Sequence, residues 1–261
     1  MTKGIVYLVG AGPGDPKLIT VYGMECIQKA DVILYDRLAS SKLLDYAKKD
    51  TELIFCGKLP GKHALIQEQI HELLVEKALE GKTVVRLKGG DPCVFGRVGE
   101  EAEVLAEQGI CYEIVPGITA GIAAPAYAGI PVTHRDHASS FAIVTGHGRE
   151  EKGADHLNWS ALAQGIDTIA FYMGIGNLHH ICSKLTEHGK DPHTPVAIIQ
   201  WGTTEKQKTV TGDLTTIEAV AEENKITHPA IVLVGEVVGL RKKIQWFEDL
   251  QANKEMQVGS Y

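Results

Sequence analysis

The segment Arg86–Glu101 combines glycines, an acid and an arginine in a pattern suited to holding a cofactor. The apolar run Thr83–Leu87 predicts a strand, and a pair of glycines, Asp91 and a proline follow it. Paired glycines at a strand end let a ligand approach the backbone, and the proline stops helix or ladder from continuing. A tight surface turn would explain the glycine pair alone. The Asp-Pro step with Arg97 close behind it favours a backbone-lined cofactor loop.

A second glycine-rich segment, Gly10–Pro16, follows the apolar run Ile5–Val9, and Asp36 follows the next predicted strand. This arrangement is similar to a dinucleotide-binding fingerprint. It fails in detail, because the third glycine comes one position early and Pro13 lies inside the loop. Asp15-Pro16 delays the next helix, and prolines remove N–H groups that a pyrophosphate needs. An NAD(P)-binding or non-catalytic nucleotide-binding protein stays the alternative from a different class.

The elements that would position these loops are visible as apolar runs that alternate with helical patterns. Strands are expected at Ile5–Val9, Val32–Tyr35, Leu53–Cys56, Thr83–Leu87 and Tyr112–Val115. Helices are expected near residues 18–29, 40–48, 65–80, 99–108 and 119–127. The runs are short, continuous and rich in Val and Ile, which is typical of strands buried on both faces. Their alternation with helices predicts an α/β domain with a mainly parallel sheet.

The second part of the chain predicts a mixed α+β domain. The polar, turn-prone segment Ala128–Ser140 suggests domains at 1–135 and 136–250, with a frayed tail at 251–261. One helix is expected near 213–223. Strands are expected at Phe141–Thr145, Thr168–Met173, Val196–Trp201, Lys208–Thr211, Ala230–Val234 and Ile244–Phe247.

Composition limits the class of protein. With 261 residues, 44% hydrophobic and 23% charged, the chain is typical of globular proteins. No apolar run approaches the roughly 20 residues of a membrane helix, and the N-terminus lacks a signal-peptide core. A net charge of −7 argues against nucleic-acid binding. Five scattered cysteines and eleven histidines without ligand spacing predict reduced thiols, no metal site and a cytoplasmic location.

Eight motifs in a fixed order carry a family resemblance. They are Val9–Pro16, Tyr35–Leu38, Gly57–Lys58, Gly89–Arg97, Val115–Ala120, Gly129–His134, Phe171–Gly174 and Pro229–Val238. Together they resemble the tetrapyrrole methylases from about residue 4 to residue 243, nearly the whole chain. Within that family the chain is most similar to the members that methylate uroporphyrinogen III.

This resemblance implies a two-domain α/β enzyme, a homodimer, that binds S-adenosyl-L-methionine (SAM) in a cleft between its domains. Its activity would be C-methylation of uroporphyrinogen III at two pyrrole carbons, C2 and C7. The product is precorrin-2, formed by way of precorrin-1 for sirohaem and cobalamin synthesis, with S-adenosylhomocysteine as the by-product. Methylation of a later corrin precursor is the alternative within the family.

The resemblance also implies roles for single residues. Asp36 and Lys58 match the positions of the proton-transfer pair, as base and acid. The residues expected to bind SAM are Pro13, Gly89, Gly90, Asp91, Val94, Thr119, Ala120, Met173, Gly202 and Ala230. An acid at the carboxyl end of a strand lies where open α/β sheets bind ligands. The alternative for Asp36 is a helix cap for residues 38–48.

A tetrapyrrole with carboxylate arms needs cations around it, and an acidic chain must supply them locally. Arg37, Arg97 and His134 are the expected substrate-binding residues. Other candidate cations in loops are Lys58, Lys62, His63 and Arg135. Arginine suits carboxylates because its planar fork can contact both oxygens. The alternative is solvated surface charge, which most Lys and Arg side chains provide.

Overall fold

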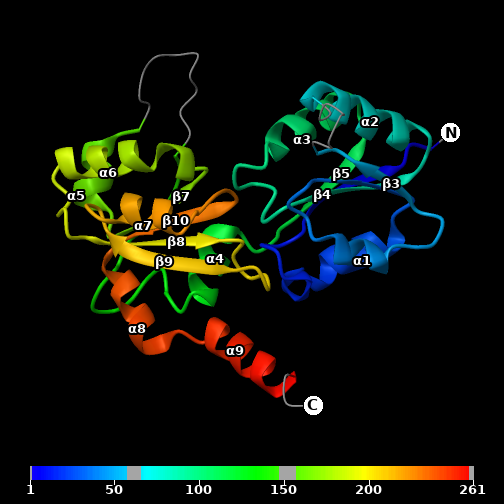
Figure 1. Ribbon diagram of the computed structural model, residues 1–261. Helices are drawn as coiled ribbons and strands as arrows, with labels where there is room; N and C mark the ends of the chain where they lie inside the picture. The colour runs from blue at the N-terminus through cyan, green and yellow to red at the C-terminus, as the bar shows by residue number, and fades with distance from the viewer. Residues whose placement is uncertain (1, 58–65, 147–156, 259–261) are drawn as a thin grey trace. The chain divides into compact units, whose positions relative to one another are not determined.

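The computed structural model describes residues 2–57, 66–146 and 157–258, with side chains described as far as residue 253. It divides into two compact units, Met1–Thr119 and Ala120–Tyr261 (Figure 1). The division falls earlier than the boundary near residue 135 that the sequence suggests. The reason is that Ala124 of helix α4 (Ala120–Tyr127) and Ala128, which follows the helix, are buried against strands of the second unit.

The first unit is built on one parallel sheet. Its strands are β1 (Ile5–Gly10), β2 (Val32–Tyr35), β3 (Glu52–Phe55), β4 (Thr83–Lys88) and β5 (Cys111–Val115). Their order is β3-β2-β4-β1-β5, and all pairs are parallel. The predicted α/β class is confirmed. The connection from β1 leads to β2 on one side of the sheet, and the connection from β4 leads to β5 on the other side. The loops after the neighbouring strands β1 and β4 therefore lie at a topological switch point.

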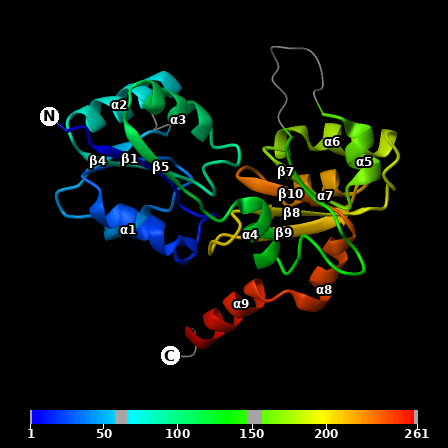
Figure 2. The same cartoon turned by 180° about the vertical axis from the view of Figure 1, so that it is seen from behind.

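Helices cover both faces of this sheet (Figure 2). They are η1 (Pro16–Leu18), α1 (Val21–Lys29), η2 (Ser41–Tyr46), α2 (Gln67–Leu79) and α3 (Val98–Glu107). Leu8 and Val84 pack with α2 and α3, whereas Val9 and Leu87 pack with α1 and η2. Because successive strand residues face opposite layers, both sets must be apolar, which explains the continuous apolar runs.

The loop after β1 delays its helix as predicted. Asp15 Oδ1 accepts a hydrogen bond from Lys17 N at 2.9 Å and caps the short helix η1. Helix α1 begins only at Val21, where Thr20 Oγ1 accepts from Gly23 N at 3.0 Å. A dinucleotide-binding fingerprint requires its glycine loop to lead directly into the N-terminus of an α-helix, and this loop does not.

The second unit contains a mixed sheet, as predicted. Its strands are β6 (Phe141–Thr145), β7 (Thr168–Tyr172), β8 (Pro195–Gln200), β9 (Lys208–Asp213) and β10 (Ala230–Val234). The order is β6-β7-β10-β8-β9. Strands β6 and β7 are parallel, and the other neighbours are antiparallel.

Helices also cover both faces of the second sheet (Figure 1). Besides α4 they are α5 (Trp159–Gly165), η4 (Ile175–Asn177), α6 (Leu178–Glu187), α7 (Ile217–Glu223), η5 (Glu236–Leu240), α8 (Arg241–Ile244) and α9 (Phe247–Val258). Helices α5, α6 and α7 bury apolar side chains against one face, and α4 and η5 against the other.

The prediction of a strand at Ile244–Phe247 is wrong, because Ile244 ends α8 and Phe247 begins α9. The aromatic rings of this segment pack on α4 instead of joining the sheet. Trp246 Nε1 donates to Ala126 O at 2.9 Å, and the Tyr127 ring lies 5.0 Å from that of Trp246. The tail expected to fray continues as helix α9 to Val258.

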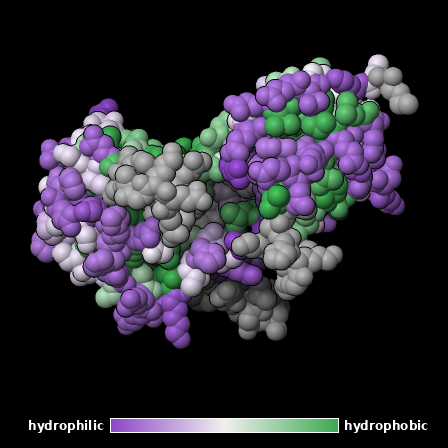
Figure 3. All heavy atoms as spheres, turned by 90° about the horizontal axis from the view of Figure 1, so that it is seen from above, coloured by the Kyte–Doolittle hydropathy of each residue, from purple (hydrophilic) through white to green (hydrophobic). Residues whose placement is uncertain are grey.

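Hydrophilic residues cover much of the visible surface in Figure 3, with apolar areas between them. Within the described ranges, none of the helices has both the length and the apolar character needed to cross a membrane.

Candidate functional site

Three loops of the first unit meet at the carboxyl edge of its sheet. Ala11 N, just after β1, donates to Lys88 O at 2.7 Å. Gly12 and Gly90 exchange two backbone hydrogen bonds, of 3.2 and 2.7 Å, so the loops after β1 and β4 form a small bridge. Backbone groups rather than side chains therefore form this part of the edge.

Glycine is required where the loops after β1, β4 and β5 touch. A Cβ on Gly117 would lie 2.3 Å from the Gly90 carbonyl oxygen and 2.8 Å from the Gly10 Cα. A Cβ on Gly10 would lie 2.6 Å from the Gly117 Cα. These distances leave no room for a side chain on Gly10 or Gly117. We call the three glycines whose backbones meet here, Gly10, Gly90 and Gly117, the glycine cradle.

Asp91 ties two of these loops together. Its Oδ2 accepts from Gly117 N at 2.9 Å, and its Oδ1 accepts from Cys93 N at 2.8 Å. The carboxylate therefore fixes the loop after β4 against the loop after β5. Of the other residues expected to bind SAM in this unit, Gly89 and Gly90 lie in the same loop directly before Asp91. Three more lie in the loops that the cradle joins, Pro13, Val94 and Thr119.

Asp36 does not cap a helix. The first turn of η2 begins after Ser40, which occupies the cap position. The Asp36 Oδ1 instead accepts a hydrogen bond from Arg86 Nη2 at 2.7 Å. Its side chain is 33% exposed at the end of β2, whereas that of Arg86 is buried. The interpretation of Asp36 as a helix cap is therefore wrong. Asp36 is a partly exposed carboxylate that pairs with the buried Arg86 guanidinium.

Sequence reasoning missed a group of buried charges on the α2–α3 face of the sheet. Glu101 Oε1 on helix α3 accepts from Arg86 Nε at 3.1 Å and from Lys88 Nζ at 2.7 Å. Burial lowers the pKa of the Lys88 ammonium, and the Arg86 charge lowers it further, against the attraction of Glu101. Arg86 and Lys88 are two positions apart in a strand expected to be buried on both faces, so both side chains point to the same face. This spacing was the sequence signal that could have indicated a buried pair of cations.

The predicted substrate-binding arginines differ in their surroundings. Both oxygens of Glu100 accept from the Arg97 guanidinium, from Nε at 2.8 Å and from Nη2 at 2.6 Å. Arg37 is exposed next to Asp36, and no hydrogen bond or ion pair joins it to another described residue. Lys58, the expected acid, lies outside the described residues. The same holds for the candidate cations Lys62 and His63.

In the second unit, three residues expected to contact SAM lie at one edge of the sheet. Met173 follows β7, Gly202 lies just beyond β8, and Ala230 begins β10. Because β10 runs antiparallel to β7 and β8, its start lies beside their ends. The antiparallel register thus brings together positions that are far apart in sequence.

Helix α4 starts at this same edge. Gly121 N in its first turn donates to the Tyr172 hydroxyl at the end of β7. A Cβ on Gly202 would lie 2.4 Å from the Ala124 Cβ, so the loop after β8 packs directly on the helix. Ala120 therefore lies near Tyr172, a residue that the sequence reasoning did not single out although it belongs to the Phe171–Gly174 motif.

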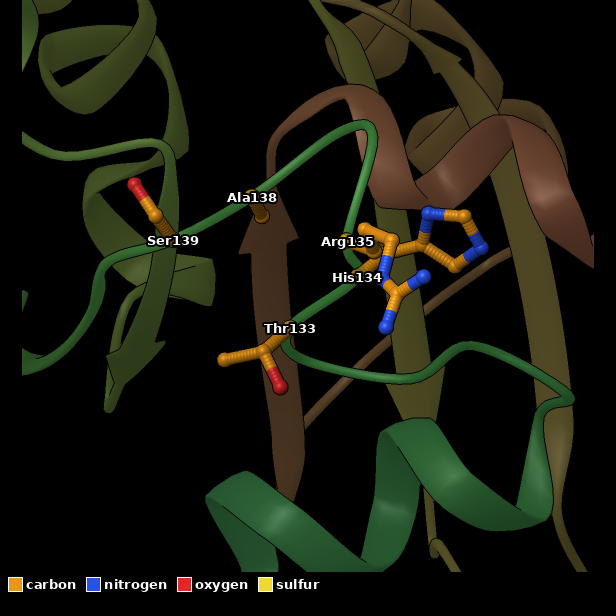
Figure 4. A pocket seen from close by; sticks show the side chains of 5 residues that line it. All are labelled: Thr133, His134, Arg135, Ala138 and Ser139. Atoms are coloured by element: carbon orange, nitrogen blue, oxygen red, sulfur yellow. The ribbon is translucent and has the colours of Figure 1, made fainter.

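His134 lines a hollow of about 470 Å³ with Thr133, Arg135, Ala138 and Ser139. Figure 4 shows the His134 ring and the Arg135 guanidinium extending from the same turn. His134 and Ala138 exchange backbone hydrogen bonds of 3.0 and 2.9 Å that close this turn. Asp136 N donates to His134 Nδ1 at 3.1 Å, so the proton of the neutral ring is on Nε2, free to donate.

Asp167 holds the other end of this turn. Its Oδ2 accepts from the backbone N–H groups of Ser139 and Ser140, at 2.8 and 2.9 Å, and from both hydroxyls. Hydrogen bonds from the Ser139 N–H first, and then from the Ser140 and Ser139 hydroxyls, lower the pKa of the Asp167 carboxyl to about 2. Because the folded protein favours the ionised form of Asp167, this carboxylate stabilises the fold at pH values above its ordinary pKa of about 3.9.

That contribution should be lost as the pH falls from about 4 toward 2. We expect Asp167→Asn to lower the melting temperature most above pH 5, and the difference from the unmodified protein to shrink on acidification. Melting curves at a series of pH values measure this. Glu107→Gln, which changes an exposed acid on α3, is the control. A difference that stays constant down to about pH 2.5 would contradict the assignment.

No group of three or more His, Cys, Asp or Glu side chains suited to a metal ion occurs within residues 2–57, 66–146 and 157–258. Within these ranges, the candidate chemistry lies in the glycine cradle, Asp36 and the cations around them.

Comparisons with known proteins show the family of this chain. The family model of the tetrapyrrole (corrin/porphyrin) methylases matches residues 5–218. A uroporphyrinogen-III C-methyltransferase of Priestia megaterium is 60% identical over 235 residues, which cover 90% of this chain and 98% of that protein. A protein of the same name from Bacillus subtilis is 57% identical over 248 residues, 95% of this chain. The chain spans only about half of that longer relative, 51% of its length.

A solved structure is similar as well. It is a uroporphyrin-III C-methyl transferase of Thermus thermophilus in complex with S-adenyl homocysteine, with 39% identity and a TM-score of 0.76. The match covers 91% of this chain and all of that one, 100%. The fold, the family model and the full-length relative agree: the chain belongs to the tetrapyrrole (corrin/porphyrin) methylases.

Proposed function

We propose that this chain transfers methyl groups from SAM to two pyrrole carbons of uroporphyrinogen III, C2 and C7. The product would be precorrin-2, formed by way of precorrin-1. The observation that carries this proposal is the glycine cradle, where Gly10, Gly90 and Gly117 let the loops after β1, β4 and β5 pack closely at the switch point of the sheet, the place where open α/β sheets bind ligands. The names of the relatives and the ligand of the solved structure support the same reaction.

Residues of both units have proposed roles in holding SAM. In the first unit, Pro13 and the loop Gly89–Val94 would contact its amino acid and ribose. The backbone amides of Thr119, the last residue of that unit, and of Ala120, the first residue of the second, would meet its carboxylate or a hydroxyl. In the second unit, Met173, Gly202 and Ala230 would contact the adenine. Their shared position at one sheet edge supports this assignment.

The proposed chemistry needs no covalent enzyme intermediate. A pyrrole carbon attacks the methyl group of the sulfonium, and the new C–C bond forms as the S–CH3 bond breaks to leave S-adenosylhomocysteine. The methylated ring then transfers a proton to the Asp36 carboxylate, and Lys58 would return a proton where the double bonds rearrange. Positioning of the two reactants supplies much of the rate. The Asp36 carboxylate is partly exposed, so a ligand can reach it, and its contact with Arg86 fixes its position at the end of β2.

A turnover assay tests the proposal directly. Incubation with SAM and uroporphyrinogen III should give S-adenosylhomocysteine and a product heavier by two methyl groups. Methylation of a later corrin precursor, but not of uroporphyrinogen III, would favour the alternative within the family. Calorimetry should detect binding of S-adenosylhomocysteine, whereas binding of NAD(P) alone would favour the nucleotide-binding alternative.

Arg37, Arg97 and His134 are the proposed contacts for carboxylate arms of the substrate. Arg37→Lys keeps the charge but loses the planar fork, so we expect the KM for uroporphyrinogen III to rise more than kcat falls. The effect should be smaller for Arg97→Lys, because Glu100 already holds that guanidinium. SAM binding, measured alone, should not change in either variant. An unchanged KM in both variants would leave the arginines without a role in substrate binding.

We also propose that the protein is a cytoplasmic homodimer that supplies sirohaem or cobalamin synthesis, as the family resemblance implies. All five cysteines are free, which supports a reducing compartment. Sedimentation at micromolar concentration tests the oligomeric state. A species of 28.3 kDa would show a monomer and contradict the proposal.

A further inference from the structure

A line of buried charges leads from helix α3 to the exposed carboxylate of Asp36. Glu101 is fully buried and binds Arg86 Nε with its Oε1 at 3.1 Å. Another nitrogen of the same guanidinium, Nη2, donates to Asp36 Oδ1 at 2.7 Å. Arg86 therefore bridges two acids, one inside the domain and one at the edge of the sheet.

The planar guanidinium makes this bridge directional. Nε and Nη2 belong to one rigid plane, so the contact that holds Nε also sets the direction in which Nη2 points. A lysine could neutralise either acid but could not bridge both with fixed geometry. The orientation of Arg86 toward Asp36 thus depends on Glu101.

Glu101 is itself held by further donors. Lys88 Nζ donates to its Oε1 at 2.7 Å, and Gln67 Nε2 of helix α2 donates to the same oxygen at 3.2 Å. Gln67 Nε2 also lies 3.1 Å from His71 Nε2, one turn further along α2. Side chains from β4 and α2 therefore fix one oxygen of a carboxylate that α3 carries.

This network is poorly explained by stability alone. Buried ion pairs contribute little net stability, because desolvation offsets the attraction between the charges. Two buried atoms of the network, Arg86 Nη1 and Glu101 Oε2, have no hydrogen-bond partner among the described residues. Of the four charged members, the side chains of Arg86, Lys88 and Glu101 are at most 5% exposed, and that of Asp36 is 33% exposed. Asp36 is therefore the one charged member of this network that a ligand can reach, and Arg86 contacts it directly.

We propose that Glu101 is a positioning residue for methyl transfer, acting through Arg86 to orient Asp36. The inference rests on the proposed role of Asp36 as the base. Arg86 and Glu101 would not touch the substrate. Their effect would be on the proton transfer after methylation and not on the binding of SAM or tetrapyrrole.

A double-mutant cycle on kcat tests this role. Glu101→Gln should lower kcat for uroporphyrinogen III methylation by about 10–100-fold, with KM and S-adenosylhomocysteine affinity changed less than about twofold. In an Asp36→Asn background the same change should lower kcat by less than about twofold further, because no base remains to be oriented. Arg86→Lys, which keeps the charge and loses the fork, should behave like Glu101→Gln.

Two further variants separate positioning from folding. Lys88→Met combined with Glu101→Gln removes one buried cation together with the buried anion, so the net charge of the network does not change. This double variant replaces Glu101→Gln if that single variant does not fold, and it should show the same loss of kcat. Lys77→Met is the matched control, because it breaks the 3.0 Å ion pair of Lys77 with Glu52 between α2 and β3, away from Asp36. It should leave kcat unchanged.

The outcomes distinguish this inference from the proposed function. Independent, multiplying losses in Glu101→Gln and Asp36→Asn would overturn the positioning role alone, as would full turnover in the Glu101→Gln or charge-balanced variant. Full turnover in Asp36→Asn would overturn the proposed base and the inference with it.

Discussion

Replacing Asp36 by Asn should lower kcat for methyl transfer to uroporphyrinogen III by about 10²–10⁴-fold, the usual contribution of a general base. Asn has nearly the same shape, but its amide cannot take the proton that the methylated ring releases. The amide also carries no charge to pair with the Arg86 guanidinium, which lies 2.7 Å away in the unmodified protein. S-adenosylhomocysteine affinity should change little, because Asp36 lies outside the glycine cradle.

Single-turnover kinetics and calorimetry on the same preparation measure the two effects separately. Asp45→Asn is the matched control, since Asp45 is an exposed acid on η2 in the same unit. Lys58→Gln should show a loss of similar size if Lys58 is the acid. A lower melting temperature with normal turnover in Asp36→Asn would instead assign Asp36 a purely structural pairing with Arg86.

Replacing Gly117 by Ala should disrupt the glycine cradle and weaken S-adenosylhomocysteine binding by about tenfold to a hundredfold. The new Cβ would lie 2.3 Å from the Gly90 carbonyl oxygen, which belongs to rigid backbone and cannot turn away as a side chain could. Forcing an extra methyl group into a packed site costs roughly 1–3 kcal/mol, so the free energy of unfolding should fall by a similar amount.

Gly99→Ala is the matched control for the cradle. Gly99 lies in helix α3, and among the described residues no atom outside its chain neighbours and the backbone of that helix lies within 4 Å of the place where its Cβ would be. Alanine there should leave ligand affinity unchanged and should not lower the free energy of unfolding, because alanine is the better helix former. Calorimetry and chemical denaturation of both variants measure these effects. Equal ligand affinity in Gly117→Ala and Gly99→Ala would show that the cradle does not shape the cofactor site.

Much of the fold could be predicted from sequence because its signals are local. The run Val32–Tyr35 is apolar at every position, and Thr83–Leu87 contains Val84, Val85 and Leu87; such runs indicate strands buried on both faces. The same local reasoning failed at Ile244–Phe247. That run is also apolar, but its rings pack on α4 through Trp246 and Tyr127, and sequence spacing carries no information about that partner.

By itself, the sequence determined the α/β class, the parallel and mixed sheets, the family resemblance and the glycine loops that carry the candidate site. Only the tertiary structure decided what the charged residues do. Asp36 directly follows β2, Arg86 lies in β4 and Glu101 in α3. They meet because β2 pairs with β4 while α3 packs over the same face of the sheet. Likewise Asp91 in the loop after β4 binds Gly117 in the loop after β5. Residue type and local spacing predict elements, whereas hydrogen bonds and ion pairs between elements depend on strand order and packing, which no local pattern encodes.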